Sequence, residues 1–167
     1  MKEGFFYRRI VLPILNLLRQ GITPEKIALS IAFGISLGVF PVIGATTLLC
    51  TAAALGFRLN LPAIQLVNYF VYPLQIALLL PFIRFGEVLF RVQEPIPFSI
   101  VQILEMIKAS IPNAVSTLWT ATMHAIVAWL LVGPLAVFLL YRILTPLLRR
   151  LAFLHKIPQS SAGAAHD

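Results

Sequence analysis

The first long apolar segment runs from Ile27 to Phe57 and contains no charged residue. A straight helix over its about 31 residues, at ~1.5 Å per residue, would be ~46 Å long, whereas a bilayer core is about 30 Å thick. Pro41 has no backbone N–H and its ring clashes with the carbonyl of Leu37, so the first helix should end near Phe40. A second helix should begin near Gly44. The pattern predicts a broken, re-entrant helical segment at 24–57.

The next apolar segment, Leu59 to Ile83, is also interrupted by a proline, at Tyr72-Pro73. Polar side chains gather around this second break at Asn68 and Gln75. Two interrupted segments in succession mark the substrate site of many repeat-built transporters. We therefore predict a second broken segment at 61–90 and a polar site where the breaks lie.

The remaining elements follow from the same patterns. Residues 1–22 predict an interfacial basic helix, and 98–111 predict an amphipathic helix on the membrane surface. The clearest crossing is a transmembrane helix at 116–141, with Trp119 at one interface and Tyr141 at the other. Together they give an all-α polytopic membrane protein with a membrane domain at 23–145. Residues 146–167 are expected to form a basic, then disordered, tail.

Small residues recur every fourth position within the first half-helix, at Ser30, Gly34 and Gly38. This spacing places them on one helix face and allows another helix to approach closely. The pattern indicates helix packing rather than a binding site.

Composition supports a membrane protein. Hydrophobic residues make up 59% of the chain and charged residues 11%, below the usual charged fraction of about 25% for soluble domains. The net charge of +7 would suit nucleic acid, but the basic residues flank apolar segments instead of clustering on a polar domain. We therefore expect a lipid bilayer, including anionic headgroups, as the partner and no nucleic acid. Five Lys/Arg before Ile27 and four after Leu140 place both termini in the cytoplasm.

Catalytic and metal-binding motifs are not found in the sequence. It has no HExxH, no CxxC and no Gly-rich phosphate loop, and its three histidines lack coordinating partners at suitable spacing. His124 is the one ionisable residue of the predicted crossing, and it either serves function or reaches the headgroups. We expect no enzyme activity, metal or cofactor.

Two functions remain open. The first is a small transporter or lipid-handling protein, with a homo-oligomer expected, in which the helix breaks bind an anionic headgroup. Its candidate binding residues are Gly44, Thr46, Thr47, Arg58, Asn60, Asn68, Tyr72, Gln75 and Arg84. The second is a non-catalytic adaptor that holds a membrane partner protein. Structural roles stay open as well: the threonines as helix caps, Asn68 as a donor to carbonyls freed by Pro73, and Arg84 paired with Glu87.

Several motifs resemble a bacterial membrane family catalogued as domain of unknown function 2062. They are Ala32-Phe33-Gly34, Gly38-Val39-Phe40-Pro41 with Gly44, Arg58-Leu59-Asn60-Leu61-Pro62, Asn68 with Pro73, and Phe85-Gly86-Glu87. The similarity covers about residues 19–141. Where the family has Asn before the second proline, this chain has Tyr72. The resemblance implies an integral membrane protein and brings no activity, substrate or cofactor. We expect a multi-pass protein of the bacterial inner membrane.

Overall fold

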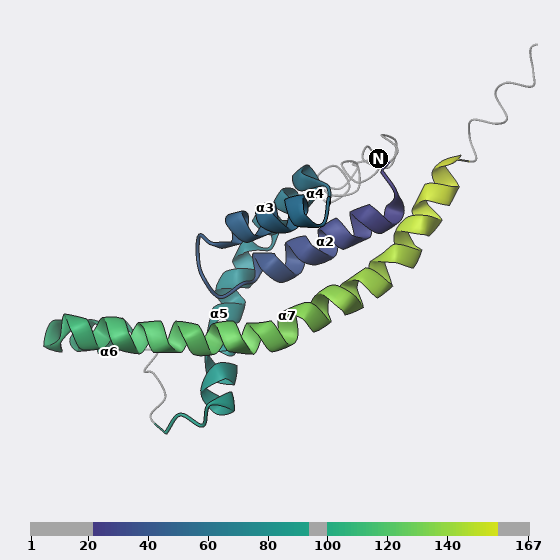
Figure 1. The fold of residues 1–167 in the computed structure, drawn as a ribbon. Helices are drawn as coiled ribbons and strands as arrows, with labels where there is room; N and C mark the ends of the chain where they lie inside the picture. The colour runs from purple at the N-terminus through teal and green to yellow at the C-terminus, as the bar shows by residue number, and fades with distance from the viewer. Residues whose placement is uncertain (1–21, 94–99, 157–167) are drawn as a thin grey trace, which may run out of the picture.

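A computed structural model describes the backbone of residues 22–93 and 100–156 (Figure 1). The regular secondary structure within these residues is entirely helical. The helices are α2 (Pro24–Gly38), α3 (Thr46–Gly56), α4 (Leu61–Phe70), α5 (Tyr72–Leu89), α6 (Ile100–Ala109) and α7 (Ile111–Lys156). The all-α prediction is thus confirmed for this part of the chain. The interfacial helix expected at 1–22 and the end of the expected tail fall outside it, apart from Ile22.

Helix α2 begins and ends for local chemical reasons. The Thr23 hydroxyl accepts a hydrogen bond from the backbone N–H of Lys26 (3.4 Å), and Pro24 occupies the first helical position, where no N–H is needed. The helix ends at Gly38, three residues before Pro41, and α3 begins at Thr46. Gly44 in the intervening turn has a φ of 90°, a conformation that glycine adopts at little cost. The segment from Ile27 to Phe57 is therefore two helices.

The second interruption lies at Val71, between α4 and α5. Asn60 caps α4 by accepting a hydrogen bond from the N–H of Ala63 (2.8 Å). Pro73 sits in the first turn of α5 and cannot donate to the carbonyl of Tyr69, which favours an interruption at this position. The break comes immediately before the Tyr72-Pro73 pair that the sequence indicates.

Helix α7 is longer than the predicted crossing at 116–141. It has 46 residues and contains Pro134 and Pro146 in its interior. An interior proline removes one backbone hydrogen bond and bends a helix without always ending it. Figure 1 shows α7 as a long rod that curves in its second half. Residues 146–156, expected to form the start of a tail, continue this helix.

The other helices pack on α7 in two places. Helix α2 lies along its second half, through a cluster of Ile27, Ala28, Ile31 and Leu148. Helix α5 crosses its first half steeply, and α3 and α4 cover α2 (Figure 1). At the crossing, a Cβ added to Gly86 would lie 2.5 Å from the carbonyl oxygen of His124, so only glycine permits this approach.

Helix α4 packs against the small residues of α2. A Cβ added to Gly34 would lie 2.9 Å from the carbonyl oxygen of Ile64, and one added to Gly38 would lie 2.3 Å from a methyl group of Val71. The third small residue, Ser30, accepts a hydrogen bond from the N–H of Asn60 (3.0 Å). This face is thus occupied from within the chain.

Candidate functional site

The two helix breaks meet in the structure. Gln75, in the first turns of α5, donates from Nε2 to the carbonyl oxygens of Phe40 (2.8 Å) and Val42 (3.4 Å), on either side of Pro41. The Gln75 side chain is 1% exposed. The two carbonyls also accept backbone N–H groups, Phe40 from Val42 (2.8 Å) and Val42 from Ala45 (3.3 Å), so the amide adds a second hydrogen bond to each and stabilises the turn at Pro41. Its orientation is set by the two carbonyls, which can only accept.

The Gln75 amide also has an unused acceptor. Its oxygen, Oε1, is buried and has no hydrogen-bond partner among the residues that the structure describes. Because Nε2 must face Phe40 and Val42, the amide cannot rotate to hide Oε1 without placing oxygen against oxygen. The place where the breaks meet therefore presents a hydrogen-bond acceptor.

A polar network beside the breaks joins α3 to α4. Gln65 donates from Nε2 to the carbonyl of Thr47 (3.0 Å) and to the hydroxyl of Thr51 (2.9 Å). Asn68 donates to the Oε1 of Gln65 (3.3 Å) and to the Thr47 hydroxyl (3.5 Å). Asn68 is 3% exposed. Its amide thus bonds other side chains and not the carbonyls freed by Pro73.

Trp129 of α7 packs against the first helix break. The rings of Phe40 and Trp129 meet edge to face with centroids 5.0 Å apart, and the Trp129 indole donates to the carbonyl of Ser36 (3.0 Å). The Ser36 hydroxyl donates in turn to the carbonyl of Gly133 (2.9 Å). These buried bonds hold the end of α2 against the middle of α7.

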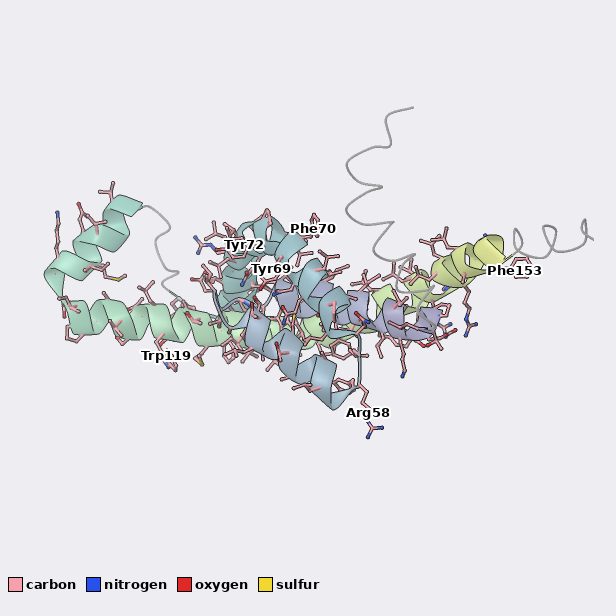
Figure 2. All side chains as sticks on the ribbon, turned by 90° about the horizontal axis from the view of Figure 1, so that it is seen from above. Arg58, Tyr69, Phe70, Tyr72, Trp119 and Phe153 are labelled. Carbon is pink, nitrogen blue, oxygen red and sulfur yellow. The ribbon has the colours of Figure 1, made fainter. Side chains whose placement is uncertain are left out.

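The structure brings only some of the candidate residues to the breaks. Thr46, Thr47, Asn68 and Gln75 lie there and are buried or half-buried, and the exposed Gly44 lies in the turn. Tyr72 lies at the start of α5 and is exposed, close to Tyr69 and Phe70 (Figure 2). Thr46 opens α3, although the capping residue is Ala45, which makes no side-chain bond.

The remaining candidates lie elsewhere. Arg58 projects outward from the end of α3 (Figure 2), and Asn60 caps α4 next to Ser30. Arg84 forms an ion pair one turn along α5 with Glu87 (2.8 Å), whose side chain is 5% exposed. The arginines expected to attract an anionic headgroup thus do not share the site of the breaks.

His124 of α7 makes a packing contact with the end of α5. The His124 ring stacks on Phe90, with centroids 4.4 Å apart. Among residues 22–93 and 100–156, no three His, Cys, Asp or Glu side chains lie close enough to hold a metal ion.

The clearest ion pair at the other end of the molecule joins α2 to α7. Arg149 donates from Nε to the Glu25 carboxylate at 2.6 Å. This hydrogen bond holds the pKa of Glu25 below its ordinary value of 4.5. It fixes the start of α2 beside the basic end of α7.

Sequence reasoning missed two members of the polar network, Gln65 and Thr51. A signal was present for the first, because Gln65 and Asn68 are three residues apart and share a face of α4. No local signal pairs Ser36 with Gly133, which are separated by 97 positions.

Two helices of the described chain, Tyr72–Leu89 and Ile111–Phe153, are long and apolar enough to cross a membrane. These two helices suggest membrane association, and the part of the chain that the structure describes is all-helical. The chain belongs to the family DUF2062, described as an uncharacterized protein conserved in bacteria, whose model matches residues 8–156. The resemblance seen in the sequence is confirmed. No curated protein and no solved structure matches the chain.

Proposed function

We propose that this protein is a multi-pass protein of the bacterial inner membrane, acting as a small transporter or lipid-handling protein without enzymatic activity. Its site is the place where the two helix breaks meet. The observation that carries this proposal is Gln75, which bonds both carbonyls at the first break and keeps a buried acceptor free.

Surface composition supports insertion in lipid. Large apolar side chains are exposed on α3, α5 and α7, among them Leu48 (74%), Val88 (73%) and Leu131 (57%). Water would make so much exposed apolar surface unfavourable, at roughly 25 cal/mol per Å². A bilayer, or neighbouring copies of the chain within it, would cover this surface.

Contacts between the helices support a re-entrant first segment. Helix α2 begins beside Arg149, through Glu25, and the connection between α3 and α4 returns to Ser30, through Asn60. The α2–α3 hairpin thus turns at Pro41 and returns toward the start of α2 as far as Ser30, the seventh of its 15 residues. In this topology Lys26 and Arg58 face the cytoplasm, as do both termini, and α4 and α5 form the segment that crosses.

The chemistry at the breaks favours a neutral polar group over an anion. Amides and hydroxyls line the network, and the ionised candidates Arg58 and Arg84 lie away from it. Gln75 Oε1 accepts hydrogen bonds only, so its ligand must donate one. A neutral headgroup or solute that bears a hydroxyl meets this requirement, and we propose it in place of the anionic ligand expected from the sequence.

The adaptor alternative loses one of its supports. It relied on the small-residue face of α2 to hold a partner, and α4 already fills this face at Gly34 and Gly38. A partner would have to bind another surface.

Vesicle transport tests the proposal. Purified protein is reconstituted, and transbilayer movement of labelled phosphatidylglycerol, a labelled neutral glycolipid and an isoprenoid phosphate is measured. We expect the glycolipid to move at least about tenfold faster than in protein-free vesicles, which corresponds to ~1.4 kcal/mol of barrier. Gln75→Leu should abolish the gain, whereas Thr122→Val, whose hydroxyl bonds only its own helix at Leu118, should keep it.

Thermal unfolding of both variants shows whether they fold. If Gln75→Leu does not fold, the lipid movement catalysed by wild-type protein alone tests the proposed function. Movement of none of the three lipids by wild-type protein would overturn the proposed function, and movement of isoprenoid phosphate alone would overturn the neutral ligand.

A further inference from the structure

Helices α3 and α5 end in the same way. Each is followed by Phe and then Arg, and the arginine has a φ of 52° in both cases, at Arg58 and Arg91. The next residue closes the turn, with Leu59 N–H donating to Ala54 (2.8 Å) and Val92 N–H donating to Glu87 (3.0 Å). This six-to-one bond is that of the Schellman motif, whose left-handed position is usually glycine.

The phenylalanines secure both turns. Phe57 stacks on Phe33 of α2 with ring centroids 5.0 Å apart, and Phe90 stacks on His124 of α7 at 4.4 Å. Each ring remains well exposed, Phe57 by 62% and Phe90 by 48%. The two Phe-Arg caps, Phe57-Arg58 and Phe90-Arg91, thus share backbone geometry, a stacked ring and an outward cation.

Arginine is energetically unfavourable in the left-handed backbone conformation, because its Cβ lies too close to the following carbonyl oxygen. Nothing in the packing of the described residues requires it there. Both side chains are exposed, and neither forms an ion pair with another described residue. Strained residues that the fold does not need are candidates for function.

We propose that the Phe-Arg caps are binding sites for the phosphate of anionic lipid headgroups. The guanidinium matches a phosphate bidentately, and an exposed ring beside it suits the boundary between headgroup and acyl chain. The membrane surface is the one occupant that provides phosphate and apolar contact side by side. This inference rests on the proposed membrane insertion and is independent of the transport activity.

The test compares two substitutions at both arginines. Arg58→Gly with Arg91→Gly removes the charge and the strain, whereas Arg58→Gln with Arg91→Gln removes only the charge. In neutral detergent we expect the glycine variant to melt about 2–4 °C above wild type per substituted site, and the glutamine variant to melt at the wild-type temperature.

Anionic lipid should reverse this order. Wild-type protein should gain Tm when phosphatidylglycerol is added to phosphatidylcholine, and both double variants should lose most of that gain. Relative binding of phosphatidylglycerol should fall about fivefold per arginine. A double variant lacking two cations of ordinary helical backbone, Arg142→Gln with Arg150→Gln, should keep the gain.

Three outcomes would overturn the proposal. They are a full lipid response in the glycine variant, an equal loss in the Arg142→Gln, Arg150→Gln control, or the same Tm gain from inorganic phosphate at matched ionic strength. Extraction of cell membranes with alkaline carbonate separates this inference from the proposed function. Release of the protein would count against membrane insertion itself, whereas retention with no lipid response would count only against the caps.

Discussion

At the scale of single residues, side-chain amides bond backbone carbonyls near the interrupted helices. Gln75 serves carbonyls that precede it by 33 and 35 positions, and Gln65 serves the start of α3 in the same way. The sequence indicates where proline frees backbone groups, because that rule is local. It does not indicate that Gln75 bonds the carbonyls of Phe40 and Val42 beside the break, because that depends on how α5 folds back on α2.

The ion pair between Glu25 and Arg149 gives a residue-scale prediction for the stability of the fold at acidic pH. The folded pKa of Glu25 lies below its ordinary value of 4.5 because Arg149 donates to the carboxylate, so the pair stabilises the fold above pH 4.5. As the pH falls through the lower folded pKa, this contribution is lost. Both side chains are more than one-third exposed, Arg149 by 64% and Glu25 by 35%, so solvent screens the pair. We therefore expect the ion pair to contribute about 0.2–1 kcal/mol to the free energy of unfolding.

Thermal melting between pH 3 and pH 6 measures this contribution. Glu25→Gln and Arg149→Gln should each lower Tm at pH 6, and the double variant should fall no further than either one. Strictly additive losses would mean that the two side chains do not interact in solution.

At the scale of elements, local rules explain the ends of helices better than their lengths. Thr23, Pro24 and Asn60 start α2 and α4 where their chemistry predicts. The end of α7 was not predictable in this way, since its two interior prolines bend the helix without ending it. The candidate site was predicted in part. The residues near the breaks come together, whereas Arg58 and Arg84 do not, because α3 runs away from the Pro41 turn and carries Arg58 beside the middle of α2.

Close approach of α2 and α4 gives the prediction at this scale. Gly34→Ala would place a Cβ 2.9 Å from both the Ile64 carbonyl oxygen and the Val67 Cβ, so α4 must shift. We expect a loss of about 1–3 kcal/mol of stability, measured by thermal or detergent-induced unfolding.

Gly56→Ala is the matched control for this substitution. It lies in the last turn of α3 with nothing within 4 Å of an added Cβ, and it should be neutral or stabilising by up to about 1 kcal/mol. Equal stability of the two variants would show that α4 does not pack on Gly34.

At the scale of the whole molecule, the proposed topology depends on the α2–α3 hairpin, which would enter and leave the bilayer on one side. The bond from Asn60 N–H to Ser30 returns the chain to the middle of α2, and α4 then runs along α2 until Val71 reaches Gly38. From there α5 leaves past α7, so that its end at Arg91 is separated from Arg58 by the α4–α5 segment.

Labelling of single cysteines on intact and opened cells tests this arrangement. Cys50 is fully buried, so Cys50→Ala provides a background with no competing thiol. Lys26→Cys and Arg58→Cys should react with a charged maleimide only when the cytoplasmic face is open, and Arg91→Cys should react on intact cells once the outer membrane is permeabilised. If Arg58→Cys also reacts under the conditions that label Arg91→Cys, the proposed topology is wrong. In that case α2 and α3 together would cross the bilayer, with the Pro41 turn inside the crossing segment, and α4 and α5 would form the re-entrant segment.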